Sequence, residues 1–557
     1  MKKYLFITAI CLFGLSFTAC DDFLDKVPDN RMELKTPTQI RKLLTNSYPD
    51  GNYSTIAELS ADNFQDNNAP DLNGNRYNLP SYGRQDDEAF AWEDIVSAVN
   101  QDSPSAIWES NYYGIAAANH ALRRIYELED EGRASEVYPH KGEALLLRAF
   151  CHFNLINIFA HTYKNETLSQ SDLGIPYVTE PEEEVSVSRE RLSVAKVYEL
   201  IEEDLKEGLF LIENYLNQSG TAYYSVPKYH FNEEASYAFA ARFYLYKKDW
   251  ENTVKYATKA LGYDPSLKMR DWNVKPATYE SLIYWIINAT SRNNFMLQAT
   301  YSGAQRRYSG SYRYTINDRD FENGNVAKNT IFGPGPSWSG YNFHPCYSGK
   351  LYISGKQDYG VWFPNAGELF EYTDKVAGIG YARIVRTEFT AEETLLCRAE
   401  AYVHLNELDL ALSDLEVWNT SRANLPTVAN IKELTFQNIS DFYSKNQYGV
   451  APVLNMDKTE LGWKGSYSGD REMLLQCALH FRRIETILSG LRWFDVKRYG
   501  IEVTHYIGKD RVEVLTWDDP RRALQIPAEV IAAGMQSNER LIVTTPSEEP
   551  TKLNTGK

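Results

Sequence analysis

Helical periodicity is the feature of this chain that most constrains its fold. Apolar residues recur at three- and four-residue steps over residues 105–129 and 194–215, which places them on one face of a helix. Residues 141–161 are apolar on nearly every side, so we predict a helix buried between neighbours. A shorter helix is predicted over residues 37–47. A mostly α-helical protein follows from these patterns.

Two later segments repeat one spacing of small and aromatic residues. The repeated positions are Ala241, Tyr244, Thr253, Ala257, Ala260 and Pro265, and then Ala399, Tyr402, Ala411, Leu415 and Trp418. This is the spacing of a tetratricopeptide (TPR) helix pair, in which small residues let two helices approach and proline ends the second. Together with the earlier helices, the repeat predicts about four stacked pairs. Stacked pairs bury a continuous core and leave a broad surface for partners.

The segments between these helices lack helical periodicity. Residues 48–102, 268–386 and 427–470 are rich in Asn, Gly, Pro and Tyr, so we predict long irregular segments with few short strands. Aromatic residues make up 13% of the chain, with 39 Tyr and 11 Trp. Tyr and Trp combine a flat apolar face with a polar edge, which suits sugar binding. Packing between helices would explain the excess equally well.

Charge and cysteine spacing exclude several classes of function. A formal net charge of −17 repels phosphate backbones, so we expect no nucleic-acid partner. The six cysteines lack metal-ligand spacing, and we expect no cofactor and no metal. Two stretches, Asp71-x-Asn73-x-Asn75 and Asp318-x-Asp320-x-Glu322, alternate oxygen ligands but lack the glycine and closing glutamate of a calcium loop. We expect ordinary Asx turns there. Cys151, Cys397 and Cys477 lie in helical patterns and are predicted to be buried thiols.

The first twenty residues have the pattern of a secretory leader. Lys2 and Lys3 precede an apolar run, residues 5–17, that is too short to span a bilayer. Small residues then lead to Cys20, which resembles a bacterial lipoprotein box with Phe17 in place of the usual Leu. We predict a signal peptide over residues 1–19, lipidation of Cys20 and a tether over residues 20–35. An uncleaved anchor, or cleavage beside a chance cysteine, is the alternative.

Residues 482–500 form an amphipathic, helix-like stretch crowded with charge, and Gly500 is a suitable stop. Charges this close to aromatic residues are costly unless paired, so we expect Glu485 and Asp495 to pair with the arginines. The stretch resembles the C-terminal signature of the SusD/RagB family. The matching residues are Arg482, Arg483, Glu485, Gly490, Arg492, Trp493, Phe494, Asp495 and Arg498. Ser489 stands where the family usually has an acidic residue, so one ion pair is expected to be missing.

The resemblance extends along the whole chain. Residues 58–64 resemble the opening of the family's N-terminal loop region, residues 147–155 one of its helices, and residues 524–527 its closing strand. It implies a single SusD-like domain over residues 36–557. The TPR scaffold would lie mainly in residues 105–265 and 388–425, the ligand-side segments in residues 48–102 and 268–386, and the signature in residues 471–530.

Members of this family are surface lipoproteins of Gram-negative bacteria that capture a glycan, or in some cases a peptide. They lie as a lid on a SusC-like TonB-dependent transporter. The resemblance therefore implies a non-catalytic binding protein anchored by lipid at the outer membrane. The sequence contains no GxSxG, HExxH, Walker A or GxGxxG motif. A RagB-like peptide-binding protein, a lipid-anchored glycosidase and a pure TPR interaction scaffold are the alternatives.

No family motif identifies the ligand residues, so composition guides the choice. Sugars stack on Trp or Tyr while Asn, Asp and Arg bind their hydroxyl groups. We expect at least two residues of the following set to contact ligand. The set is Asn73, Arg76, Tyr82 and Trp92 in the first irregular segment, and Tyr301, Tyr312, Trp338 and Tyr341 in the second.

Overall fold

The structure is a computed structural model, and it describes part of the chain. The described residues are 34–96, 101–181, 189–217, 223–307, 312–316, 333–338, 347–353, 356–422, 432–445, 454, 456, 458–463 and 467–540, with only the backbone described over 347–353 and 356–362. Several sequence predictions lie outside them: the leader, Cys20, nearly all of the tether over residues 20–35, Tyr341 and the calcium-like stretch at residues 318–322.

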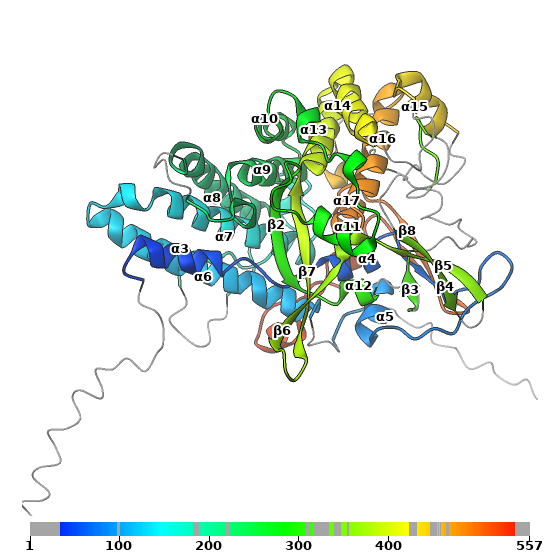
Figure 1. The fold of residues 1–557 in the computed structure, drawn as a ribbon, viewed down its shortest axis with the longest axis horizontal. Coiled ribbons are helices and arrows are strands. Elements are labelled where there is room, and N and C mark those ends of the chain that lie inside the picture. The colour runs from blue at the N-terminus through cyan, green and yellow to red at the C-terminus, as the bar shows by residue number, and fades with distance from the viewer. Residues whose placement is uncertain are drawn as a thin grey trace, which may run out of the picture.

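A scaffold of paired helices forms most of the molecule. Its helices are α6 (Pro104–Asp130), α7 (Tyr138–Phe159), α8 (Val194–Tyr215), α9 (Glu233–Lys247), α10 (Trp250–Leu261), α13 (Ala391–Leu405) and α14 (Leu408–Ser421). Sequence neighbours pack together from α6 to α8, then α9 on α10 and α13 on α14, and α10 packs on α13. Figure 1 shows α6 to α8 as one arm, with α9, α10, α13 and α14 stacked beside it. The predicted mostly α-helical scaffold is confirmed.

The TPR repeat predicted from the sequence corresponds to two turns with the same backbone conformation, one after α9 and one after α13. Lys248 and Asn406 both adopt left-handed backbone conformations, with φ of 65° and 63°, directly after α9 and α13. In each turn the next backbone N–H donates to a tyrosine carbonyl, Asp249 to Tyr244 and Glu407 to Tyr402, both at 2.9 Å. Identical turns at matching positions explain why the small and aromatic residues recur at the same intervals.

The segments predicted to be irregular contain more regular structure than expected. The first holds α4 (Ser54–Ser60) and α5 (Arg84–Phe90), after α3 (Pro37–Thr45). The second holds α11 (Tyr279–Ile286), α12 (Ala304–Arg307) and a three-stranded antiparallel sheet in the order β2-β7-β6. Its strands are β2 (Asn294–Tyr301), β6 (Glu368–Asp374) and β7 (Ile379–Thr390).

The sheet could not be predicted from the sequence because charged residues of β7 are buried. Arg386 and Glu388 on β7 are both buried and paired with each other at 2.9 Å, so the strand does not alternate apolar and polar residues. The α4 helix is similar, since all seven of its residues are buried although four are polar or charged. In both elements, partners elsewhere in the chain make burial of the polar groups tolerable.

Short two-stranded pairs complete the fold. They are β1 (Gln65–Asp66) with β3 (Tyr314–Thr315), β4 (Tyr347–Ile353) with β5 (Lys356–Trp362), and β8 (Val503–Ile507) with β9 (Arg511–Leu515). The remaining helices are α15 (Phe436–Tyr443), α16 (Asp470–Glu485), α17 (Leu491–Arg498) and α18 (Ala528–Ala532). The closing strand expected at residues 524–527 is absent from this described stretch. It is replaced by an extended segment in which the Leu524 N–H donates to the Ile158 carbonyl at 3.0 Å.

The signature stretch is two helices rather than one. The first helix, α16, ends at Glu485, and Leu488 and Gly490, with φ of 60° and 83°, then turn the chain into α17. A Cβ at Gly490 would lie 2.9 Å from the Ser54 Cα, so only glycine fits. Gly500 has φ of 58°, as its predicted role as a helix stop requires.

The predicted ion-pair network is confirmed at Asp495 and differs at Glu485. Asp495 lies 3.1 Å from Arg482 and 2.7 Å from Arg498, and all three side chains are buried. Glu485 instead pairs with Arg422, which lies outside the stretch. Buried positive charges require buried partners, and several come from other elements. The further pairs are Arg498 with Glu400, Arg482 and Arg242 with Glu393, and Arg492 and Arg483 with Asp62.

Two smaller predictions can also be checked. Cys151, Cys397 and Cys477 are free and buried, as expected, and burial raises the pKa of each thiol. Among the described residues, no helix is both long enough and apolar enough to cross a membrane.

Candidate functional site

Two of the predicted ligand residues lie at the tip of a surface loop. Asn73 and Arg76 are exposed. The Asp71 carboxylate accepts from the backbone N–H groups of Asn73 and Asn75 at 2.9 and 2.8 Å, which is the expected Asx turn. Within the described ranges, no group of three or more His, Cys, Asp or Glu side chains is placed to hold a metal ion.

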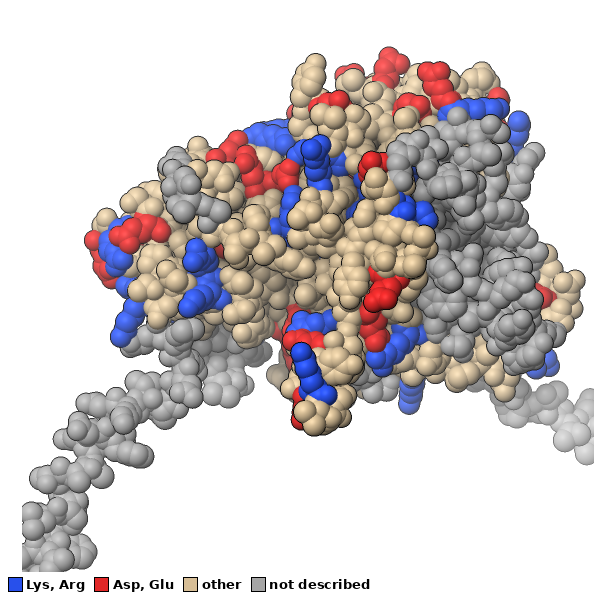
Figure 2. Space-filling view, viewed as in Figure 1, with Lys and Arg blue, Asp and Glu red and all other residues tan. Residues whose placement is uncertain are grey.

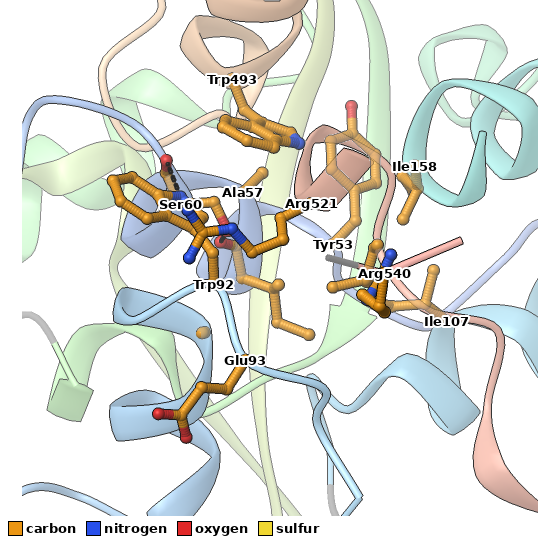
Figure 3. Close-up of a pocket in the computed structure, with 13 residues that line it drawn as sticks. Tyr53, Ala57, Ser60, Trp92, Glu93, Ile107, Ile158, Trp493, Arg521 and Arg540 are labelled. Carbon is orange, nitrogen blue, oxygen red and sulfur yellow. Dashed lines mark hydrogen bonds between the residues drawn. The ribbon is translucent and has the colours of Figure 1, made fainter. Parts of the chain in front are cut away.

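Trp92 is buried rather than presented to solvent. Its indole N–H donates to the Ser60 carbonyl at 2.9 Å, and its ring stacks on His505 with centroids 4.2 Å apart. Figure 3 shows Arg521 crossing this ring, with Trp493 above and Glu93 pointing away. The cavity beside it has a volume of about 20 Å³, room for about one water molecule. Trp92 therefore supports the loop region from within.

Trp338 is likewise buried. Its indole N–H donates to the Gly333 carbonyl at 3.0 Å, and its ring packs on Phe481 at 5.7 Å. A Cβ at Gly335 would lie 2.2 Å from the indole, so the chain closes tightly around this side chain. Neither tryptophan offers a free face to a ligand.

The structure does bring Tyr82 and Tyr312 together. Their rings meet edge to face with centroids 5.6 Å apart, and Tyr82 is 39% exposed while Tyr312 is half-buried. The Arg307 guanidinium lies 4.9 Å from the Tyr82 ring centroid. That arginine is fixed by Asp86 at 2.9 Å, and burial raises the pKa of Asp86 to about 6 although Arg307 opposes the rise. The space beneath the pair is only about 10 Å³, so a ligand would lie on it and not within it.

A second tyrosine pair forms on the sheet. Tyr301 of β2 meets Tyr381 of β7 edge to face at 5.6 Å, and Tyr381 is exposed. The Arg383 guanidinium covers Tyr301 at 3.9 Å and donates to its hydroxyl oxygen at 2.6 Å. The same arginine also pairs with Glu371 of β6.

One corner of the chain joins the two pairs. The N–H of Ser302, next to Tyr301, donates to the carbonyl of Ala382, next to Tyr381, at 3.1 Å. A Cβ on Gly303 would lie 3.5 Å from the Tyr82 hydroxyl. The pairs therefore lie on either side of the Ser302–Gly303 corner. We call Tyr82, Tyr312, Tyr301 and Tyr381, with the arginines 306, 307 and 383, the tyrosine surface.

Sequence reasoning missed Tyr381 and the three arginines. A strand prediction for this segment would have placed Tyr381 and Arg383 on one face, because residues two apart in a strand point the same way, but the buried charges on β7 removed the alternation that would have indicated it. Three carboxylates next to the tyrosine surface, those of Asp86, Glu368 and Glu371, are held by arginine. Glu368 pairs with Arg306 through contacts of 2.6 and 2.8 Å. In Figure 2, positive and negative side chains lie side by side on the face drawn, including the β6–β7 hairpin at the bottom.

This architecture is similar to that of known proteins. Residues 22–245 match a family model described as SusD-like, "Starch-binding associating with outer membrane". A SusD superfamily structure from Bacteroides thetaiotaomicron is similar at a TM-score of 0.59 and 16% identity, covering 91% of this chain and 100% of that one. A Bacteroides vulgatus SusD superfamily protein gives 0.57 and 17%, covering 90% and 98%. A SusD-like carbohydrate binding protein from the same species gives 0.53 and 18%, covering 86% and 89%. No curated protein matches.

At these identities the structural matches define the class of fold, which is that of the SusD superfamily. Residues 22–245 therefore match the SusD-like family model, and about nine-tenths of the chain shares the fold of SusD superfamily structures.

Proposed function

We propose that this protein is a non-catalytic, outer-membrane-associated protein that binds a glycan on the tyrosine surface during nutrient uptake. The family description, starch binding with outer-membrane association, supports this class of function. The observation that carries the proposal is the joining of two tyrosine pairs, each with one exposed ring, by one corner of the chain. An extended ligand, such as a polysaccharide, could contact both pairs at once.

The chemistry of the tyrosine surface suits sugars. Tyrosine rings offer apolar faces for the C–H groups of a sugar, and guanidinium N–H groups donate to hydroxyl oxygens. Its arginines are neutralised by Asp86, Glu368 and Glu371, which favours an uncharged ligand. Glycosidases need one carboxyl group poised as an acid and another as a base or nucleophile. Carboxylates engaged by arginine are poor candidates for either role, which favours binding over hydrolysis.

The wider setting rests on the family. We propose that residues 36–557 form one SusD-like domain, carried on a lipid attached to Cys20 and exposed at the cell surface. Its partner would be a SusC-like TonB-dependent transporter that receives the glycan. Purification from detergent-solubilised outer membrane tests this partner, and recovery of the protein without a transporter would contradict it.

Binding can be tested on the purified protein with a panel of polysaccharides, using isothermal titration calorimetry. The double variant Tyr82→Ala/Tyr312→Ala should lose at least tenfold in affinity, about 1.4 kcal/mol, because it removes the stacking faces. Tyr263→Ala is the matched control, since Tyr263 is fully exposed elsewhere on the surface. Unchanged affinity in the double variant would exclude the tyrosine surface. Binding only to peptides would favour the RagB-like alternative, and release of sugar products would favour a glycosidase.

A further inference from the structure

A groove lies between α6 and the irregular segment over residues 176–180, apart from the tyrosine surface. It has a volume of about 240 Å³. One water molecule needs about 10–15 Å³ of such volume, so this groove can hold a small molecule. The residues that line it include Trp108, Tyr112, Pro176, Val178, Glu180 and Arg189. None of these residues belongs to the tyrosine surface.

The indole N–H of Trp108 is an unused donor on this groove. The side chain is only 7% exposed, and its N–H makes no hydrogen bond to any described residue, yet it remains within reach of solvent. The unpaired indole N–H groups of Trp272 and Trp463 differ, because both are closed off from solvent. Since the groove is the hollow that Trp108 lines, a molecule in the groove can accept a hydrogen bond from this N–H.

Tyr112 provides a fixed aromatic ring beside this donor. Its ring centroid lies 4.9 Å from that of Trp108, and its hydroxyl donates to the Pro176 carbonyl at 3.0 Å. Tyr112 is half-buried, so part of its side chain is open to the groove that it lines. The donor and the ring are therefore in place before any ligand arrives.

The wall over residues 176–180 is fastened to the helices behind it. The Val178 N–H donates to the Nε2 atom of His152 on α7 at 3.1 Å, and the Val178 carbonyl accepts from Asn119 on α6 at 3.0 Å. Because the fold itself holds this wall in place, a ligand does not have to order it on binding, which lowers the cost of association.

Two charged side chains also line the groove. Glu180 is exposed, and its carboxylate forms no hydrogen bond or ion pair with the described residues. Its oxygens can therefore accept from the hydroxyl groups of a ligand. The positive charge of Arg189 offsets that of Glu180, so the groove favours a neutral ligand over an anion or a cation.

We propose that this groove binds one neutral sugar ring. Tyr112 would lie against the C–H face of the sugar, Trp108 would donate to a hydroxyl oxygen, and Glu180 would accept from hydroxyl groups. The inference rests on the proposed glycan-binding function and adds a sugar site separate from the tyrosine surface.

The test titrates ¹⁵N-labelled protein with glucose, galactose, mannose and xylose, and follows the indole N–H resonances by NMR. The resonance that is absent from Trp108→Phe belongs to Trp108, and at least one of these sugars should shift it in the wild-type protein. Glu180→Ala changes an exposed side chain and should weaken that sugar at least fivefold. Glu251→Ala, at an exposed glutamate on α10, is the matched control and should leave affinity unchanged.

The double variant Tyr82→Ala/Tyr312→Ala separates this site from the tyrosine surface. It should retain the sugar-induced shift of Trp108 while polysaccharide binding falls. If polysaccharide binding falls in this variant but no sugar shifts Trp108 in the wild type, the groove proposal is overturned and the proposed function stands. The groove proposal is also overturned if Glu180→Ala binds sugar as the wild type does, or if a sugar-soaked wild-type crystal shows only water at the Trp108 indole.

Discussion

The buried ion-pair network and the tyrosine surface use the same residue types in opposite ways. In the network, Arg482, Arg498 and Asp495 are all nearly inaccessible to water. At the tyrosine surface, Arg306 and Tyr381 are about half exposed. The network coincides with the most conspicuous sequence motif of the chain, whereas the tyrosine surface has no motif.

The difference teaches that a conspicuous sequence motif can mark residues that must be buried. A buried arginine needs partners at fixed positions, and this requirement dictates several residues together. A sugar-binding surface needs only flat faces and donors, which many arrangements supply. The following tests ask whether the ion-pair network stabilises the fold and whether the tyrosine surface binds ligand.

The largest effect is expected from Asp495→Ala. The change leaves Arg482 and Arg498 buried with one partner fewer, and removal of one member of a buried ion pair typically costs 3–5 kcal/mol, so about that loss of unfolding free energy is expected. Urea denaturation followed by circular dichroism measures it. Asp510→Ala, at a highly exposed aspartate, is the control and should change stability by less than about 0.5 kcal/mol. A loss below about 1 kcal/mol at Asp495 would show that the network is not a stability element.

Glu58 gives a pH-dependent test of the same buried region. Its carboxylate accepts from the Gly490 N–H at 2.9 Å, and burial raises its pKa from 4.5 to about 7. The folded state therefore holds a proton that the unfolded state releases, so this stabilisation is complete below about pH 4.5 and is lost as the pH rises to about 7. The lost contribution is about 3 kcal/mol. The stability of the wild type relative to Glu58→Gln should fall by this amount over that range, whereas parallel pH profiles would refute the assignment.

Trp92→Phe should produce an intermediate effect confined to stability. The variant leaves the buried Ser60 carbonyl without its indole partner, which costs about 1–3 kcal/mol. Glycan affinity should not change, because the ring is buried. Thermal unfolding and calorimetric titration measure the two quantities. Loss of glycan affinity with unchanged stability would show instead that Trp92 contacts the ligand.

Tyr381→Ala should have the smallest effect on stability and a measurable one on binding. The side chain is about half exposed, so the unfolding free energy should change by less than about 0.5 kcal/mol. Affinity for an extended glycan should fall severalfold while affinity for a short oligosaccharide falls less. Equal losses for both lengths would mean that the two tyrosine pairs do not share one ligand.

The sequence determined the helical part of this fold more fully than the site. Residues 194–215 were predicted as a helix and α8 spans the same residues, because its apolar face repeats cleanly. The strand β7 was missed because Arg386 and Glu388 face inward. Tyr82 and Tyr312 were singled out by residue type, but their meeting depends on pairing of strands β1 and β3, 250 residues apart in the chain. Trp92 and Trp338 have the same residue chemistry as a sugar platform, and only packing shows that they are internal.

The ion pairs of Asp62 limit the order in which the chain can fold during synthesis. Asp62 binds Arg492, 430 positions away along the chain, and also Arg483. A nascent chain therefore cannot form these two ion pairs until residues 483–492 have been synthesised, and contacts this distant form slowly. A product truncated before Arg483 would keep the buried Asp62 carboxylate without either of its arginine partners.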